Sequence, residues 1–200
     1  MFCILVTGIP AAGKSTMARR LSEKLGLPMI SKDQIKEILF DELGFRSREE
    51  KVKEGVAAMN IMYYMAEQLR RVKQPFILEN NFEAVSKEGL MELLDRYNYR
   101  AITVTLTGDY QVIYQRFLER NNSPERHRGH VVNDCYPEKV VNQKVAALSY
   151  EEYVAGIQKR GMDHFTANGP GIVVDTTDFE KINLDEVMKL ITSFKCEKPF

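Results

Sequence analysis

The chain has 200 residues, of which 44% are hydrophobic and 28% charged, so an ordinary globular protein of one domain, spanning 1–200, is expected. Basic and acidic residues balance at 28 each, so no overall field draws in nucleic acid or an anionic membrane. Cys3, Cys135 and Cys196 are far apart and form no CxxC pair, which argues against a disulfide scaffold or a zinc site and indicates a reducing compartment. The apolar N-terminal run is too short for a membrane span and lacks a signal-peptide pattern, so we expect a cytoplasmic location.

Short β-rich apolar runs alternate with stretches of helical periodicity, which is typical of repeated βαβ units. The alternation predicts a three-layer α/β/α fold with a five-stranded, mainly parallel sheet, and Ser31 as a helix cap. In chain order, it predicts a strand at 2–7, a helix at 14–25, a strand at 28–30, helices at 32–42 and 47–73, a strand at 76–79, a helix at 84–97, a strand at 101–106, helices at 109–121, 137–147 and 149–163, a strand at 171–175 and a helix at 183–194.

The stretch GIPAAGKST, residues 8–16, connects the first predicted strand to the first predicted helix. Gly8 and Gly13 allow backbone torsions that a Cβ would hinder, so successive N–H groups can converge on phosphate oxygens. Lys14 can reach the β- and γ-phosphates, Ser15 offers a hydroxyl to Mg²⁺, and the N–H of Thr16 can face the α-phosphate. A chance match in a small-residue turn is the alternative. The preceding strand and following helix favour a site for a nucleoside triphosphate with Mg²⁺.

A carboxylate follows the second predicted strand. Asp33 would face the same sheet edge as the phosphate loop, where it can accept the proton of a hydroxyl that attacks the γ-phosphorus. Lys36 lies one helical turn further and could hold an anionic group of the substrate. The alternative, that Asp33 caps the helix and Lys36 is solvated, remains open.

The third predicted strand ends in a carboxylate followed by two amides. Glu79 closes the apolar run PFILE, an unusual place for an acid unless it binds something. It could order a water on Mg²⁺ or hold the attacking hydroxyl, and Asn80 and Asn81 could contact the substrate. Plain strand-end polar residues are the alternative.

Residues 121–134 form a polar, proline-containing stretch that interrupts the α/β rhythm and predicts a lid. Arg116 and Arg120 precede it on one helical face, while Arg126 and Arg128 lie within it. An arginine brought in by a closing lid can stabilise charge on a transferred phosphoryl group. Pairing of these arginines with helix acids is the alternative. Further upstream, the mixed-charge strip 46–55 is expected to be solvated.

Together these motifs resemble the P-loop kinase superfamily, and within it the zeta-toxin-like, chloramphenicol-phosphotransferase-like and polynucleotide 5′-kinase-like proteins. The resemblance covers roughly residues 1–135. Residues 8–16 match the phosphate loop, with Ala11 where many members have glycine, and SKDQIK, residues 31–36, matches the segment that carries the catalytic aspartate. Glu79 and the arginines match the later elements. The resemblance implies a P-loop NTPase fold that uses ATP and Mg²⁺.

The resemblance also implies roles for single residues. Asp33 would be the general base, while Lys14, Arg120 and Arg126 would stabilise charge. Glu79 would act on the metal through water, alongside Ser15. The implied nucleotide-binding residues are Gly8, Ala11, Ala12, Gly13, Lys14, Ser15, Thr16, Arg116, Thr176 and Thr177, and the implied substrate residues are Lys36, Glu79, Asn80 and Asn81.

The function predicted from the sequence is an ATP-dependent phosphotransferase that moves the γ-phosphate to a hydroxyl of a small molecule. A polynucleotide 5′-hydroxyl kinase is an alternative, which Lys36 disfavours because polynucleotide kinases tend to carry the more specific arginine fork there. A regulatory ATPase or a nucleotide-binding module without acceptor phosphorylation is another. The acceptor is not identified, and its specificity is expected from the helices around 45–70 and 84–97.

Overall fold

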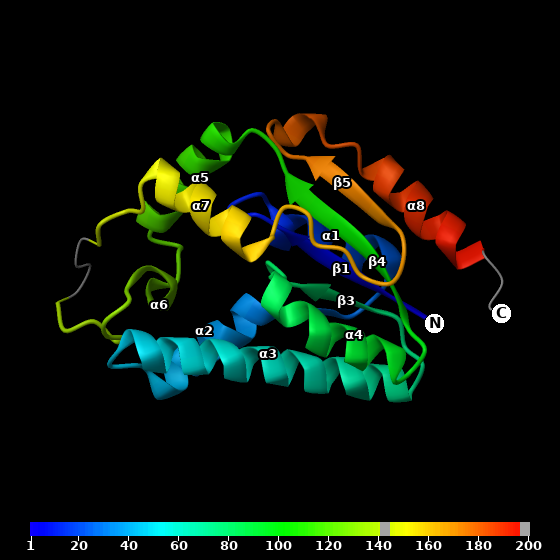
Figure 1. The fold of residues 1–200 in the computed structure, drawn as a ribbon, viewed down its shortest axis with the longest axis horizontal. Coiled ribbons are helices and arrows are strands. Elements are labelled where there is room, and N and C mark those ends of the chain that lie inside the picture. Colours follow the sequence, from blue (N-terminus) through cyan, green and yellow to red (C-terminus); the bar gives the residue numbers. More distant parts are fainter. Residues whose placement is uncertain (141–144, 197–200) are drawn as a thin grey trace.

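The computed structural model of the chain describes residues 1–140 and 145–196. Five strands form one sheet in the order β2-β3-β1-β4-β5, and every pairing is parallel (Figure 1). Each strand starts and ends within about a residue of its predicted bounds. The strands are β1 (Phe2–Gly8), β2 (Met29–Ser31), β3 (Phe76–Glu79), β4 (Arg100–Thr107) and β5 (Gly171–Asp175).

Helices cover the sheet and extend beyond its carboxyl edge. They are α1 (Lys14–Leu25), α2 (Lys32–Leu43), α3 (Arg48–Arg71), α4 (Lys87–Asp95), α5 (Tyr110–Asn122), α6 (Arg128–Val131), α7 (Tyr150–Arg160) and α8 (Leu184–Cys196). Short 3-10 turns lie at Ala84–Ser86 and Phe179–Lys181. The short helix α6 was not predicted.

The predicted helix at 137–147 is wrong in the described part of that range. Residues 137–140 and 145–147 are not helical, and residues 141–144 lie outside the described residues. The apolar side chains Val140, Val145 and Leu148, which produced the helical periodicity, are exposed. An amphipathic pattern forms a stable helix mainly when its apolar face is buried, and these side chains have no core to join.

The central strand β1 shows why the sheet is covered on both faces. Cys3 and Leu5 point into a core shared with α3 and α4. Ile4 and Val6 point into the opposite core, shared with α1, α7 and α8. A parallel strand buried on both faces reads as a continuous apolar run, as this one does. The predicted three-layer α/β/α arrangement is confirmed.

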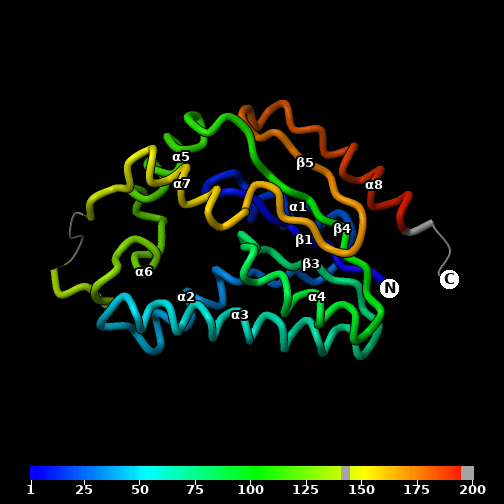
Figure 2. The backbone as a smooth tube through the Cα atoms, viewed as in Figure 1, coloured from blue at the N-terminus to red at the C-terminus, as the bar shows by residue number. Residues whose placement is uncertain are grey.

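Because all strands are parallel, their carboxyl ends meet at one edge of the sheet, where open α/β folds bind ligands. Glu79 at the end of β3 lies in register with Ser31 of β2 and with Val6 of β1. Figure 2 shows α5, α6 and α7 toward this edge, at the end of the molecule opposite the N-terminus. This arrangement brings the phosphate loop, α2 and residues 121–134 to the same end.

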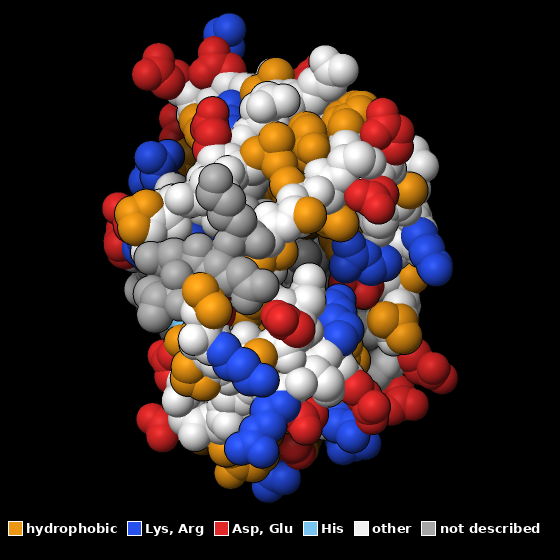
Figure 3. Space-filling model, turned by 90° about the vertical axis from the view of Figure 1, so that its left-hand side faces the viewer, with side chains coloured by type: hydrophobic (Ala, Val, Ile, Leu, Met, Phe, Trp, Pro, Cys, Tyr) orange, Lys and Arg blue, Asp and Glu red, His pale blue; other side chains and the backbone are white. Residues whose placement is uncertain are grey.

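The surface at that end is shown in Figure 3. Acidic and basic side chains intermingle on this face and leave no continuous basic stripe across its visible part. In the two described stretches, no helix has both the length and the apolar composition that a membrane span requires.

Candidate functional site

The phosphate loop, residues 8–16, takes backbone conformations that favour glycine. Gly8, Ala11 and Gly13 have φ angles of 127°, 67° and 85°. A Cβ on Gly8 would lie 1.9 Å from the carbonyl oxygen of Leu106 on β4, so no larger residue fits there. The loop leads directly into α1, whose first turn contains Ser15 and Thr16. A helix N-terminus reached through such a loop presents free N–H groups to an anion.

Lys14 lies buried over this loop. Its Nζ donates a hydrogen bond of 2.8 Å to the carbonyl oxygen of Ile9. Burial lowers the pKa of Lys14 to about 8, although the nearby carboxylates of Glu79 and Asp33 act in the opposite direction. An ammonium group that is poorly solvated gains from a neighbouring anion, so the site favours phosphate oxygens.

Glu79 is only 3% exposed and is held by two hydroxyls. Ser15 Oγ donates to its Oε1 at 3.4 Å, and Ser31 Oγ donates to its Oε2. Burial raises the pKa of Glu79 against the effect of Lys14. Ser31 precedes the first residue of α2, as predicted. Its hydroxyl makes no capping bond because it donates to Glu79 instead. Hydroxyl and carboxylate oxygens are ligands that Mg²⁺ prefers, so Ser15 and Glu79 fit the predicted metal.

Asp33 lies in the first turn of α2, on the same side of the molecule as the phosphate loop. Within the described chain its carboxylate accepts no backbone hydrogen bond, so the capping alternative is not observed. Crowding by protein atoms would raise its pKa, but His130, Arg126, Lys14 and Lys36 together outweigh that effect and hold it below its usual value. Asp33 is therefore ionised and can accept a proton.

Arg120 at the end of α5 and Arg126 beyond it converge near these acids. Burial lowers the pKa of Arg120 to about 10 and also lowers that of Arg126, while Asp33 and Glu79 act in the opposite direction on both. The Nε atoms of both arginines are buried and lack a hydrogen-bond partner in the described part of the chain. The alternative of pairing with helix acids is not observed for either. Two guanidinium groups with spare donors beside a carboxylate are suited to a phosphoryl group.

Arg116, Thr176 and Thr177 are brought together beyond the phosphate loop. Arg116 donates through Nη1 to the carbonyl oxygen of Thr176 and through Nη2 to that of Thr177, each at 2.5 Å. Its guanidinium lies 4.0 Å from the ring centre of Phe179. A Cβ on Gly13 would lie 2.8 Å from the same ring. Phe179 thus links Arg116 to the phosphate loop, a role that no sequence pattern indicated.

Asn80 and Asn81 join the end of β3 to β1. The N–H of Asn80 donates to the carbonyl oxygen of Val6 at 3.2 Å, and the hydroxyl of Thr7 donates to the carbonyl oxygen of Asn81 at 2.7 Å. The side chain of Asn80 is buried beside the sulfur of Met59. These contacts give both residues a structural role, and their contact with a substrate stays a prediction.

The predicted lid, 121–134, packs against α2 and α3. His130 Nε2 lies 2.9 Å from Glu37 Oε1, and His127 Nε2 lies 3.0 Å from Asp41 Oδ1. A Cβ on Gly129 would lie 2.4 Å from the ring of Phe40, so the segment contacts α2 closely. The segment therefore packs on α2 beside the site, where Asp33 is still exposed, and its action as a lid stays a prediction.

Lys51 on α3 holds the same segment through hydrogen bonds. It is 3% exposed, and its Nζ donates to the carbonyl oxygens of His130 and Val132 and to Asn133 Oδ1. Glu54, one turn along, is also buried. The expectation that the strip 46–55 is solvated is therefore wrong at these two positions, because residues 128–133 fold back over this part of α3. A contact between segments so far apart in sequence leaves no local pattern.

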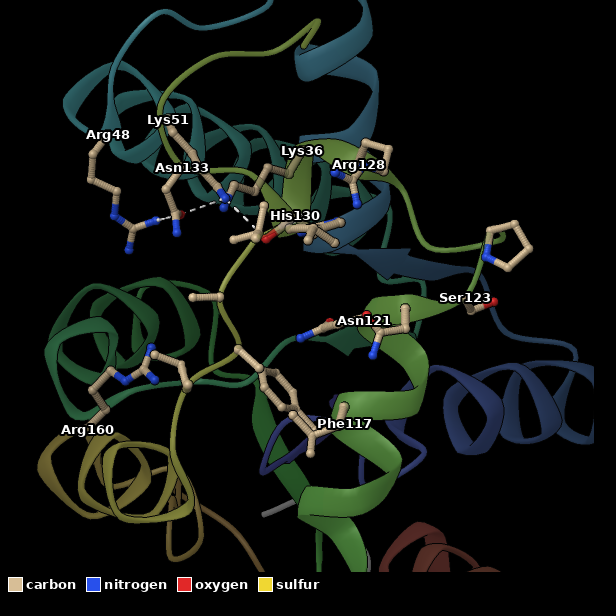
Figure 4. Close-up of a pocket in the computed structure, with 18 residues that line it drawn as sticks. Lys36, Arg48, Lys51, Phe117, Asn121, Ser123, Arg128, His130, Asn133 and Arg160 are labelled. Atoms are coloured by element: carbon tan, nitrogen blue, oxygen red, sulfur yellow. Dashed lines mark hydrogen bonds between the residues drawn. The ribbon is translucent and has the colours of Figure 1, made fainter. Parts of the chain in front are cut away.

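A pocket of about 800 Å³ lies beside this cluster, between α2, α3, α5, the predicted lid, residues 145–148 and the end of α7 (Figure 4). None of the described residues that line it is acidic. Helix α3 contributes to its wall, whereas no described lining residue comes from 84–97, because α4 packs on the sheet instead. That these two helices set acceptor specificity stays a prediction. We call it the basic pocket, and its polar wall includes Lys36, Arg48, Lys51, Asn121, His130 and Asn133.

The phosphate loop is also contacted by α7, which lies in the part of the chain that matched no motif. The hydroxyl of Tyr153 on α7 donates to the carbonyl oxygen of Pro10 at 2.8 Å. Tyr153 is buried in the core that also contains Ile9 and Ala12. Helix α7 therefore holds the phosphate loop through a residue that is distant from it in sequence.

Comparison with known proteins supports the fold and, at the level of the family, nucleotide binding. A family model described as an AAA domain matches residues 4–140. The structure of a candidate kinase from Chloroflexus aurantiacus J-10-fl is similar, with 28% identity, 96% of each chain covered and a TM-score of 0.78. Shikimate kinase from Bacteroides thetaiotaomicron shares the fold at 17% identity, with 98% of each chain covered and a TM-score of 0.56. A gluconokinase from Sinorhizobium meliloti 1021 shares it at 14% identity, with 94% and 87% of the two chains covered and a TM-score of 0.52. No curated protein sequence matches the chain.

Proposed function

The chain belongs to the AAA-domain family and has the fold of the P-loop kinase superfamily, and on this premise we propose that it transfers the γ-phosphate of ATP to a hydroxyl of a small molecule. One observation carries the proposal. The ionised Asp33 shares a single electrostatic cluster with Lys14, Arg120 and Arg126 beside the phosphate loop. That is the set of groups that phosphoryl transfer to an alcohol requires. The similar structures described as kinases agree with this reading.

In the proposed complex, the backbone amides of residues 8–16 and Lys14 bind the β- and γ-phosphates. Thr16 adds its N–H in the first turn of α1. Ser15 and Glu79 would hold Mg²⁺, Glu79 through water, and the bound ion neutralises charge on the phosphates. Arg116, with Thr176 and Thr177, borders the nucleotide.

In the proposed reaction, the acceptor oxygen attacks the γ-phosphorus, and Asp33 accepts the hydroxyl proton. The bond between the γ-phosphorus and the bridging oxygen breaks, and its electron pair leaves with ADP. Arg120 and Arg126 direct their unpartnered N–H groups at the transferred phosphoryl oxygens. Closure of the segment 121–134 excludes water, which would otherwise compete with the acceptor.

Two other functions use the same nucleotide site. A polynucleotide 5′-hydroxyl kinase requires a surface that tracks a nucleic-acid backbone, and the mixed charges in Figure 3 give that function little support. A regulatory ATPase requires no proton acceptor for an alcohol, so Asp33 would be dispensable for turnover. Assignment to the zeta-toxin-like, chloramphenicol-phosphotransferase-like or polynucleotide-kinase-like group depends on the acceptor.

The test is the substitution Asp33→Asn, assayed with ATP or GTP against sugars, hydroxy acids, nucleosides, antibiotics and oligonucleotide 5′ ends. We expect ATP affinity to change by no more than a few-fold and phosphate transfer to fall about 10²- to 10⁴-fold. Glu42→Gln, which neutralises an exposed acid of the same helix, is the control and should leave both unchanged. Equal turnover in wild type and Asp33→Asn would falsify the proposal.

A further inference from the structure

The basic pocket adjoins the proposed general base. Lys36 lies three residues after Asp33 on α2, and His130 faces both Asp33 and the pocket. Within the described chain, Lys36, Arg48 and Lys51 form no ion pair with a carboxylate. Other basic residues of the wall do have acidic partners, since Arg128 pairs with Glu138, Arg160 with Glu83 and His130 with Glu37. An excess of positive charge therefore lies beside Asp33.

The surroundings of these three cations do little to offset that excess. Arg48 Nη1 donates to Asn133 Oδ1 at 2.9 Å, and the hydrogen bonds of Lys51 go to neutral oxygens (Figure 4). Lys36 is positioned over the ring of Phe40, 5.1 Å from its centre. Burial and the charges of Lys36 and Arg48 lower the pKa of Lys51 to about 7. Two carboxylates, Asp33 and the buried Glu54, act on Lys36, so the three cations still outnumber the acids near them. Like charges in such excess are stabilised when an anion joins them.

We infer that the phosphate acceptor itself carries an anionic group, a carboxylate or a phosphate, which the basic pocket binds while the hydroxyl lies against Asp33. This inference rests on the proposed function. Lys36 and Arg48 bind the anion, and Lys51 strengthens the local positive charge while it holds residues 130–133 in place. Asn121 and Asn133 offer neutral hydrogen-bond groups to the remainder of the molecule.

The size of the pocket favours a small molecule over a nucleic acid. A volume of about 800 Å³ lies in the range of small-ligand sites, roughly 300–1,000 Å³. The surrounding face mixes acidic and basic side chains, which does not favour an extended polyanion (Figure 3). The occupant we infer is therefore a small anionic alcohol.

The experiment compares matched acceptors that differ only in charge, namely hydroxy acids against their amides and sugar phosphates against the free sugars. We expect kcat/KM to be about 100-fold higher for the charged member. Lys36→Met and Arg48→Met should each raise KM for the charged acceptor at least tenfold without changing KM for ATP. Lys53→Met is the matched control on α3, because Lys53 is exposed and paired with Glu49.

A second measurement does not depend on finding the acceptor. Inorganic phosphate is titrated by calorimetry into protein saturated with Mg-ADP, which occupies the phosphate loop. Binding is expected in wild type and Lys53→Met, and its loss is expected in Lys36→Met. No binding to wild type, or equal binding to all three proteins, overturns the inference.

The remaining outcomes separate this inference from the proposed function. Equal transfer to charged and neutral acceptors overturns the inference and leaves the kinase proposal intact. Transfer confined to oligonucleotide 5′ ends overturns the small-molecule occupant. Turnover that is insensitive to Asp33→Asn removes the proposed function itself.

Discussion

The phosphate loop and the basic pocket lie side by side but are built in opposite ways. The loop consists of consecutive residues, and its binding groups are mainly backbone amides, set by torsions at Gly8 and Gly13. The pocket is lined by residues of α2, α3, α5 and α7 and of the segments 121–133 and 145–148, which meet only in the folded chain. This difference separates general recognition of a nucleotide from specific recognition of an acceptor. Backbone amides can bind any triphosphate, whereas in the proposed function the choice of acceptor would depend on the side chains of the pocket.

The largest effect is expected from Gly8→Ala, which tests whether the loop depends on its backbone path. The new Cβ would lie 1.9 Å from the carbonyl oxygen of Leu106, in a left-handed backbone conformation. We expect the free energy of unfolding to fall by about 3 kcal/mol or more, measured by urea denaturation. Gly26→Ala is the control, because Gly26 is also left-handed but has nothing within 4 Å of its added Cβ. Equal losses in the two variants would show that the close approach to β4 is unimportant.

The next effect concerns charge at the boundary between the two regions. Arg120→Gln removes a half-buried guanidinium whose buried Nε has no partner in the described chain. We expect kcat to fall about 10²- to 10³-fold, with ATP affinity within a few-fold of wild type. Arg19→Gln, on the exposed face of α1, should have no effect. A large loss of ATP affinity with unchanged kcat would instead assign Arg120 to ground-state binding of the nucleotide.

The sequence predicted the strands well because each is a short apolar run bounded by polar or small residues, and burial on both faces makes such runs distinctive. It failed at 137–140 and 145–147, the described part of a predicted helix, where exposed valines produce a helical periodicity. There the chain follows longer-range contacts, such as the bridge between Phe45 and Tyr136 and the ion pair of Arg128 with Glu138. Such contacts override local periodicity and are not visible in a single sequence.

The same division holds at the site. The common location of residues 8–16, Asp33 and Glu79 could be predicted because strand ends and a local motif fix their positions, while their roles stay predictions. Phe179, Tyr153 and Lys51 could not, since each acts through a partner distant in sequence. The apparently solvated strip 46–55 was misinterpreted for this reason. Charged residues at helical spacing look alike whether they face water or another segment.

The pH dependence of the free energy of unfolding tests the environment of Lys51 in the basic pocket. The pKa of Lys51 is about 7 in the folded protein, against about 10.4 for an unfolded lysine. The unfolded chain therefore binds more protons between these values, so stability rises with pH across that window. From pH 6.5 to 9 we expect Lys51 to contribute an increase of about 2 kcal/mol, which Lys51→Met removes. If wild type and Lys51→Met show parallel pH profiles of stability, Lys51 lies in a solvated environment and the prediction is wrong. The control Lys53→Met should follow the wild-type profile.

A smaller effect is expected from Phe179→Ala, which removes the ring that lies against both Arg116 and Gly13. The cation–π contact is worth about 1 kcal/mol, so nucleotide affinity should fall about three- to tenfold as Arg116 loosens. Affinity can be measured by titration of a fluorescent ATP analogue. Tyr64→Ala, an exposed aromatic residue on α3, is the control. An unchanged affinity would show that the two carbonyl bonds suffice to hold Arg116.

The smallest effect is expected at Ala11, where the loop carries alanine at a φ of 67°. Ala11→Gly removes the strain of a left-handed alanine, about 1–2 kcal/mol. It also makes the unfolded chain more flexible, which costs about 0.4–1 kcal/mol. The net gain in stability should therefore be about 1 kcal/mol or less, visible as a rise of a few degrees in the melting temperature. Nucleotide affinity should change little, because both residues present the same amide in the same conformation. A loss of affinity would mean that the alanine holds the loop rigid for the phosphates, so that even this backbone-built site depends on a side chain.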